Sequence, residues 1–341
     1  MNVCVFFGGR SNEHEVSLRS SYAVLEAIDT EKHTVHKIGI SRDGKWYLFE
    51  GENREILEDK WVKNSKNTPV CVDFSAKKLI CGEKTVDADI IFPVMHGEDG
   101  EDGKIQAVAS LLGSRLVGVS SAAASLCMDK YLCKLVARDN SIKTAPYEIL
   151  RQGEAQKARG VFERLKTKEA FVKPTICGSS VGISRVKRGE SIDVALSHAF
   201  KYSDSVLIEK TIKGRECEVA VLEEKGKIIA SRVGALSYES DFYDYATKYK
   251  SNRVKYEIPA KIPSECVNLC RNYAKIMFKA LGCTGLCRVD FFVTSAHTVY
   301  FNEVNAIPGF TEGSMYPMLM ADIGLDMRTL VETLIKNAQG R

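Results

Sequence analysis

The sequence predicts an α/β protein of two or three domains, beginning with a Rossmann-like parallel-sheet domain. Three observations support this class. The chain has 341 residues, which is long for a single core. Strand-like segments, glycine-rich loops and helix-like segments alternate through roughly the first hundred residues, as in parallel α/β sheets. Near the end, two β-branched and aromatic runs flank a short polar connection, which is the pattern of a β-hairpin.

The first segment is expected to form the parallel sheet. Ligands of such sheets bind at the carboxyl ends of the strands, and both Glu15 and His96 lie at such ends. Neither a dinucleotide fingerprint nor a Walker P-loop occurs in this segment. For either residue alone, an ordinary loop position is the alternative. The predicted strands are 3–9, 33–41 and 88–97, and the predicted helices are 18–28 and 104–112.

The middle segment is expected to provide a phosphate-binding flap. Residues 120–140 predict one long amphipathic helix carrying Lys130, and residues 151–169 a surface helix. The stretch FVKPTICGSSVGISRVK predicts two strands joined by a loop of small residues. Backbone N–H groups of such a loop can surround phosphate oxygens, and Lys173 would add a positive charge. Seen alone, such a Gly-Ser loop is more often a plain hairpin.

The last segment is expected to combine a hairpin, a lid, two helices and the acidic hairpin. Residues 236–260 contain five tyrosines from Tyr238 to Tyr256 and few branched aliphatic residues, which favours an ordered lid. Residues 264–282 and 326–338 predict amphipathic helices. Between them, AIPGFTEGSMYP predicts a turn-rich loop.

The acidic hairpin CRVDFFVTSAHTVYFNEVN is the clearest candidate for a site. A turn near residues 296 and 297 puts Asp290 opposite Glu303 and Arg288 opposite Asn305, all on one face. Facing carboxylates repel each other. A hard divalent cation such as Mg²⁺ would relieve that repulsion, and an ion network centred on Arg288 would also do so. The hairpin alone leaves both hypotheses open.

Composition argues against several classes of protein. The formal net charge is only +4, from 48 basic and 44 acidic residues, without a basic run that would indicate nucleic-acid binding. Nothing approaches the roughly 18 apolar residues of a membrane span. The 11 cysteines include no C-x-x-C pair, and the C-x3-C pairs at 266 and 283 are typical of buried small side chains. A reducing cytoplasm is the expected location.

Eight motifs in order resemble the D-alanine:D-alanine ligase family of the ATP-grasp superfamily over nearly the whole chain. They are GGRSNEHEVS, FPVMHGEDGEDG, CMDK, FVKPTICGSSVGIS, VLIEKTIKGRE, FYDYATKY, CRVDFF and FNEVNAIPGFT. The resemblance implies a mixed α/β ATP-grasp fold. It also implies an N-terminal substrate domain over 1–119, a central ATP-grasp subdomain over 120–208 and a catalytic domain over 209–341.

The resemblance implies that the chain binds ATP and two Mg²⁺ ions, with Mn²⁺ as a substitute. The phosphates would be bound by Lys130 and Lys173 with Ser180 in the flap. The metal ligands would be Asp290, Glu303 and Asn305, which would answer the repulsion within the hairpin. The residues lining the adenosine end would be Glu209, Lys210, Thr211, Ile212 and Glu216.

The implied reaction joins two D-alanine molecules through an acyl phosphate, for peptidoglycan precursor synthesis. Arg288 and the Gly309 N–H would stabilise the tetrahedral intermediate. A closing lid would exclude water from the acyl phosphate. The residues expected to bind substrate or to connect the domains to the lid are Glu15, His96, Ser179, Lys248, Tyr249, Ser314 and Met315.

The resemblance leaves alternatives for the substrates. Glu312 and Gly313 depart from the residues that many relatives carry, which puts the second amino-acid site in question. D-Serine is therefore the second candidate, and Tyr249 argues against D-lactate. An ATP-grasp carboxylase or nucleotide-pathway ligase would leave the Glu15 and His96 loops without a purpose, and a regulatory nucleotide-binding protein would not need every site lysine and carboxylate. The family further suggests a homodimer, and a monovalent cation near the flap remains open.

Overall fold

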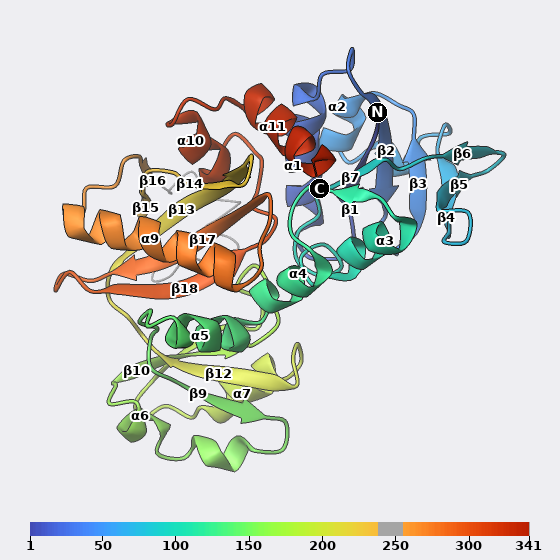
Figure 1. Cartoon of the computed structure of the whole chain (residues 1–341). Helices are drawn as coiled ribbons and strands as arrows, with labels where there is room; N and C mark the ends of the chain where they lie inside the picture. The colour runs from blue at the N-terminus through green and yellow to red at the C-terminus, as the bar shows by residue number, and fades with distance from the viewer. Residues whose placement is uncertain (238–254, 341) are drawn as a thin grey trace.

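The computed structural model describes residues 1–237 and 255–340, and it confirms the predicted mixed α/β class (Figure 1). Three sheets follow one another along the chain. The first lies in the blue-to-teal part of the ribbon, the second in the green-to-yellow part and the third in the yellow-to-red part. None of the helices in this described part is long and apolar enough to cross a membrane.

The first sheet has the strand order β6-β5-β4-β3-β2-β1-β7-β8. Its β2-β1-β7-β8 half is parallel, as predicted, and an antiparallel half that the sequence pattern did not reveal extends it. Its strands are β1 (Asn2–Gly8), β2 (Thr34–Ile40), β3 (Trp46–Phe49), β4 (Thr68–Asp73), β5 (Lys78–Cys81), β6 (Lys84–Val86), β7 (Ile90–Pro93) and β8 (Arg115–Leu116). The helical segments beside it are α1 (His14–Ala27), α2 (Asn53–Leu57), η1 (Trp61–Lys63) and α3 (Lys104–Leu112).

The second sheet is antiparallel and small, with the order β11-β10-β12-β9. Its strands are β9 (Tyr147–Arg151), β10 (Glu169–Pro174), β11 (Ser184–Lys187) and β12 (Ser205–Lys210). The helical segments that follow its strands are η2 (Ala155–Ala158), α6 (Val161–Arg164) and α7 (Asp193–Ala199). The predicted boundary between residues 208 and 209 falls inside β12.

The third sheet has the order β16-β15-β13-β17-β18, with β14 beside β13. Its strands are β13 (Arg215–Glu224), β14 (Lys227–Ala230), β15 (Gly234–Ser237), β16 (Lys255–Glu257), β17 (Leu286–Val293) and β18 (Val299–Asn305). The helices of this part of the chain are α9 (Ser264–Ala280), α10 (Met315–Ala321) and α11 (Met327–Gln339). The end of the predicted loop 306–317 therefore forms the start of α10.

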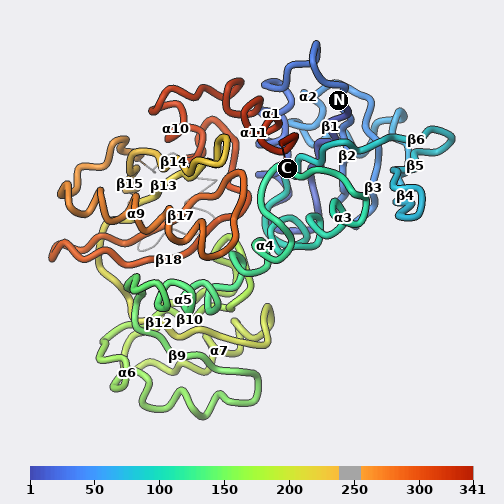
Figure 2. Tube along the Cα trace, in the orientation of Figure 1, coloured from blue at the N-terminus to red at the C-terminus, as the bar shows by residue number. Residues whose placement is uncertain are grey.

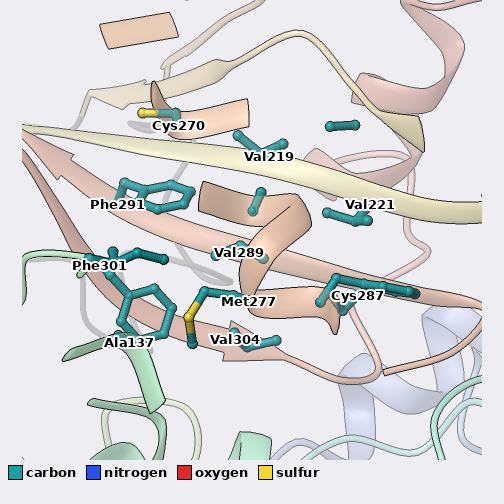
Figure 3. Close-up of a cluster of buried hydrophobic side chains, with 14 of the residues drawn as sticks. Ala137, Val219, Val221, Cys270, Met277, Cys287, Val289, Phe291, Phe301 and Val304 are labelled. Atoms are coloured by element: carbon teal, nitrogen blue, oxygen red, sulfur yellow. The ribbon is translucent and has the colours of Figure 1, made fainter. Parts of the chain in front are cut away.

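Strand β17 shows why this sheet can carry a site. Its residues alternate between two faces, and the odd-numbered Cys287, Val289 and Phe291 are fully buried. Figure 3 shows them among apolar side chains of β13, β18 and α9, including Met277. Burial of these apolar side chains stabilises the sheet. The even-numbered Arg288 and Asp290 are left on the opposite face.

The predicted helix over 120–140 is wrong in one respect, because it is two helices. These are α4 (Ser121–Met128) and α5 (Lys130–Asp139), separated by Asp129 in an extended conformation. The Asp129 carboxylate accepts hydrogen bonds from the N–H groups of Tyr131 and Leu132, which caps α5. The Asp129 backbone also pairs with Ile176 in the flap. A local cap and a tertiary bridge thus outweigh helix propensity.

The predicted helix over 151–169 is also wrong. Only η2 and the single turn α6 form there, because Gly153 and Gly160 adopt left-handed conformations with φ of 85° and 72°. High charge and helix-forming residues suggested a continuous helix, but the two glycines interrupt it.

Cores are shared between the three parts of the chain. Helices α4 and α5 contribute Ala124, Cys127 and Ala137 to the core of the third sheet rather than the second. Helix α11, through Leu334 and Ile335, packs with the core of the first sheet. Figure 2 shows the red end of the trace beside the blue N-terminal part, where both termini lie. This shared packing joins the first sheet to the third and anchors α4 and α5 on the third, whereas the second sheet has a core of its own.

Candidate active site

A cavity of about 1340 Å³ lies between the three sheets. Its lining combines acidic side chains from the third sheet with lysines from α5 and the second sheet. Most of the residues predicted as a site are brought together here, although they are spread over more than 200 positions. The predicted residues that line it are His96, Lys130, Lys173, Ser179, Ser180, Glu209, Lys210, Thr211, Ile212, Glu216, Arg288, Glu303, Asn305, Gly309, Ser314 and Met315.

The two predicted pairs of the acidic hairpin are confirmed, although the register shifts between Asp290 and Phe291, which was not predicted. Asp290 pairs with Glu303 and Arg288 with Asn305 across β17 and β18. On the other side of β17, Asp290 pairs with Glu218 of β13. Three carboxylates therefore stand in one row across three strands, which is one more than the sequence prediction contained. The alternation of Glu216 and Glu218 in β13 was the available signal for the third.

Arg288 balances two members of this row. Its Nε and Nη2 donate hydrogen bonds to the two carboxylate oxygens of Asp290 at 2.8 and 2.7 Å, and Nε lies 2.9 Å from Glu218 Oε2. Asn305 Nδ2 also donates to Asp290 Oδ2, at 3.0 Å. The ion network proposed as an alternative to a metal therefore exists for Asp290 and Glu218. It leaves Glu303 and Asn305 facing the cavity.

The oxygen donors of the hairpin fit a hard cation that is bound together with phosphate. Within residues 1–237 and 255–340, no three His, Cys, Asp or Glu side chains gather closely enough to hold a metal ion by themselves. Mg²⁺ in phosphate-binding sites commonly takes one or two protein carboxylates and completes its shell with phosphate and water. Glu303 and the amide oxygen of Asn305 suit that arrangement. Asp290 lies beneath them and does not line the cavity.

The flap between β10 and β11 has the backbone of an anion-binding loop. Ser179 and Ser180 adopt left-handed conformations with φ of 51° and 60°, which is unusual for residues other than glycine. Lys130 Nζ donates to the Cys177 carbonyl at the base of the flap, so α5 and the flap are joined. The buried Ser179 Oγ has no hydrogen-bond partner within the described residues.

Lys173 and Glu209 face each other across β10 and β12. Lys173 Nζ donates to Glu209 Oε2 at 2.7 Å. Burial disfavours the charged lysine, but the Glu209 carboxylate outweighs it, so the pKa of Lys173 is raised. Burial likewise opposes the charged carboxylate, and Lys134 and Lys173 together lower the pKa of Glu209 to about 2. Both side chains are therefore ionised at neutral pH.

The first domain holds the loop that follows the acidic hairpin. His96 Nδ1 lies 3.0 Å from the Ile307 carbonyl, and the Ile307 N–H donates to Glu101 Oε1 at 3.2 Å. Burial lowers the pKa of His96. Burial, with the Glu13 carboxylate second, raises the pKa of Glu101. The sequence prediction missed Glu101, although it lies in the quoted motif FPVMHGEDGEDG.

The structure corrects the placement of Glu15. Its side chain is 58% exposed, faces Arg42 at 3.5 Å and does not line the cavity. Glu13 lines it instead, and a Cβ at Gly97 or at Gly178 would lie about 3 Å from Glu13 Oε2. Helix α1 begins at His14, earlier than predicted. Glu13 therefore precedes the helix and faces the flap, whereas Glu15 lies on an outer face of the first turn.

Another part of the cavity lining contains the residues predicted for the second substrate. Ser314 precedes α10, and its Oγ accepts a hydrogen bond from the Thr311 N–H at 3.1 Å. The same oxygen would lie 2.6 Å from a Cβ at Gly309, so the two predicted residues are adjacent. Glu312 and Gly313 also line this part. Lys248 and Tyr249 lie outside the described residues.

Comparisons with known proteins agree on one family. The model described as D-ala D-ala ligase N-terminus matches residues 2–119, and the model described as D-ala D-ala ligase C-terminus matches residues 136–336. The D-alanine--D-alanine ligase of Acetivibrio thermocellus is 40% identical over 361 aligned positions, covering 99% of this chain and 96% of that protein.

Two further matches are a resistance protein and a ligase named for D-Ala and D-Ser. The Vancomycin C-type resistance protein VanC1 of Enterococcus gallinarum is 37% identical over 340 positions, covering 99% of this chain and 98% of that protein. The crystal structure of the VanG D-Ala:D-Ser ligase from Enterococcus faecalis superposes with a TM-score of 0.91 at 38% identity, covering 99% of both chains.

Proposed function

Because the chain belongs to the D-alanine:D-alanine ligase family, we propose that it joins two D-alanine molecules to D-alanyl-D-alanine, a peptidoglycan precursor. The protein is an ATP-dependent ligase, and ADP and phosphate are its other products. The observation that carries this proposal is that residues of the acidic hairpin line the same cavity as Lys130 and Lys173. Anionic phosphate and oxygen-seeking cations are the ligands that such an arrangement selects.

The phosphate end of the site is assigned to the flap and its lysines. Lys130, Lys173 and the backbone of Ser179 and Ser180 would bind the phosphates of ATP. A divalent cation belongs to the family's chemistry, and Glu303 and Asn305 would hold two Mg²⁺ ions or Mn²⁺ there. Asp290, which Arg288 engages beneath them, would be the third ligand. When bound, the ions would neutralise charge on the transferring phosphoryl group. The adenosine end would lie against Glu209, Lys210, Thr211, Ile212 and Glu216.

The amino-acid end of the site is assigned to the acidic hairpin and the first domain. The carboxylate of the first D-alanine attacks the γ-phosphate and becomes an acyl phosphate, and the amine of the second D-alanine then displaces phosphate. Arg288 and the Gly309 N–H would stabilise the oxyanion of the tetrahedral intermediate. The ammonium of the first D-alanine would pair with Glu13, while Ser314 and Met315 would contact the second amino acid and His96 would hold the adjoining loop.

Ser179 supports a link between the flap and the lid. Its buried hydroxyl has no partner within the described residues, and Glu13 lies beside Gly178 in the same flap. We therefore propose that Ser179 and Tyr249 belong to a hydrogen-bonded connection between the first domain, the flap and the lid. Glu13 replaces Glu15 as the residue of the first domain in this connection. Lys248 would reach the phosphates from the same lid.

D-Serine is the second candidate for the second substrate. Both VanC1 and the VanG D-Ala:D-Ser ligase match over almost the whole chain. The acidic Glu312 beside Gly313 gives this end of the cavity a polar side chain that could approach a hydroxymethyl group. D-Alanine remains the primary proposal because two ligases named for it are 40% and 39% identical to this chain, compared with 37% for VanC1 and 38% for the VanG ligase.

The test is Mg²⁺- and ATP-dependent phosphate release with D-alanine alone and with D-alanine plus D-serine, with products identified by mass. D-Alanyl-D-alanine as the main product in both mixtures supports the proposal. Preferential D-alanyl-D-serine would assign the second substrate to D-serine and direct attention to Glu312. No release with any D-amino acid would contradict the ligase function.

The correction at Glu13 gives a paired prediction. Glu13→Gln lowers kcat/KM for D-alanine by about 10²-fold, because a buried carboxylate that pairs with the substrate ammonium is lost. Glu15→Gln changes it by less than about 2-fold, because an exposed ion pair contributes little. Both variants are compared by steady-state kinetics at saturating ATP. The reverse order of effects would restore Glu15 as the site carboxylate.

The cellular setting is a proposal as well. All 11 cysteines are unpaired, which supports a reducing cytoplasm. The family resemblance supports a homodimer formed through the N-terminal domain, which sedimentation would test. Whether a monovalent cation binds near the flap can be measured by comparing rates in K⁺ and in Na⁺.

A further inference from the structure

A second lysine lies behind the proposed phosphate site. Lys134 is one helical turn after Lys130 on α5, on the same side of the helix. Its side chain is only 2% exposed, and its Nζ lies 2.5 Å from Glu209 Oε1. Lys173 Nζ lies 2.7 Å from the other oxygen of the same carboxylate, Oε2. One buried carboxylate therefore lies between two buried ammonium groups.

The two lysines differ in their access to the cavity. Lys173 and Glu209 line it, whereas Lys134 lies behind them, with its Nζ 6.0 Å from the ring centre of Tyr147. A buried charge without a counter-charge is strongly unfavourable. Lys134 therefore needs the carboxylate of Glu209 as its counter-ion. Glu209, in contrast, would keep a counter-ion in Lys173 even if Lys134 were absent.

The net charge of Lys134, Lys173 and Glu209 gives a physical reason for the presence of Lys134. Lys173 and Glu209 alone would form a neutral pair, and the ammonium of Lys173 would be largely compensated before any ligand arrived. With Lys134 present, the cluster carries a net charge of one positive unit next to the cavity. At the low effective dielectric of a buried site, that difference acts strongly on an anion a few ångströms away.

We propose that Lys134 is a positioning residue that neutralises Glu209 and thereby leaves the ammonium of Lys173 available to the phosphates of ATP. The inference rests on the proposed ATP-binding function, and it adds a residue that does not itself touch the nucleotide.

The test compares the binding of ATP and of adenosine by equilibrium titration. In Lys134→Met, the affinity for ATP falls by about 10-fold, because Lys173 is then held by Glu209. The affinity for adenosine, which carries no phosphate, changes by less than about 2-fold. Lys134→Arg retains the charge and restores most of the ATP affinity. Lys201→Met, at an exposed position of the same subdomain, is the matched control and binds both ligands as the unmodified protein does.

A double variant makes the test independent of general damage to the fold. In Lys134→Met with Glu209→Gln, neither group remains to compensate the other, and Lys173 is again an uncompensated cation. The ratio of ATP affinity to adenosine affinity should return towards that of the unmodified protein. A purely structural role for Lys134 would weaken both ligands alike, so the affinity ratio would not fall in the single variant and would have nothing to recover in the double one.

Three results would overturn the inference: unchanged ATP affinity in Lys134→Met, equal losses for ATP and adenosine, or no recovery of the affinity ratio in the double variant. These outcomes are separate from failure of the proposed function. An unmodified protein that binds ATP but turns over no D-amino acid would contradict the ligase assignment and leave the binding comparison valid. An unmodified protein that does not bind ATP would overturn both.

Discussion

Glu303→Gln lowers ATP-dependent phosphate release with D-alanine by about 10³-fold, because the amide keeps the size of the side chain but loses the charge that holds the cation. Glu303 and Glu218 of the acidic row both line the cavity, but Arg288 already engages Glu218 and Asp290. Loss of this one negative charge should therefore act on the metal and its phosphate rather than on the ion network.

The free energy of unfolding of Glu303→Gln distinguishes a loss of cation binding from damage to the fold. Glu303 faces Asp290 directly across the strands, so removal of its charge relieves a repulsion that offsets the lost attraction to Arg288 and Lys173. The free energy of unfolding of Glu303→Gln, measured with urea, should be equal to or higher than that of the unmodified protein. Glu265→Gln, on the exposed first turn of α9, serves as the control with normal activity. Full activity in Glu303→Gln would remove the basis for a metal at this hairpin.

Arg288→Met is expected to affect both stability and activity. Arg288 lies between the carboxylates of Asp290 and Glu218, and each of these side chains is only 3% exposed. Its removal leaves two buried carboxylates without their counter-ion, which costs about 3–5 kcal/mol of unfolding free energy. Activity should fall by a further factor of about 10² or more, because the intermediate loses a cationic hydrogen-bond donor.

Arg288→Lys distinguishes the two contributions. Lysine keeps the positive charge but cannot donate to both oxygens of Asp290 in the same planar geometry. Stability in urea should recover most of the loss seen in Arg288→Met, while kcat stays well below that of the unmodified protein. A lysine variant with normal kcat would mean that Arg288 serves the fold alone, without a role in the reaction.

The part of the site carried by regular strands was predictable from sequence. Alternation of side chains between the two faces of a strand limits which residues can face each other, so the pairing of Asp290 with Glu303 could be predicted from the position of the turn. The register shift after Asp290, which interrupts the alternation in β18, could not. Helix α3 was predicted with its observed bounds, because Gly113 ends it in a left-handed conformation with φ of 69°.

Other features depended on contacts that no local pattern contains. The break at Asp129 depends on a bridge to Ile176, more than forty residues away. Glu13 and Glu15 are both acids near the start of a helix, and only the true beginning of α1 decides which faces the cavity. Lys134 resembles any helical lysine until the position of Glu209 is known. In each case tertiary contacts determined the role of the residue.

The measurement that most directly tests the acyl-phosphate reaction uses D-alanine labelled with ¹⁸O in its carboxylate. If the carboxylate attacks the γ-phosphate and the second amine then breaks the C–O bond, one labelled oxygen leaves with phosphate. Mass analysis of the products should therefore find ¹⁸O in inorganic phosphate in step with dipeptide formation, and the Glu303→Gln variant should form neither. Dipeptide formation with no ¹⁸O in phosphate would contradict phosphoryl transfer to the carboxylate at this site.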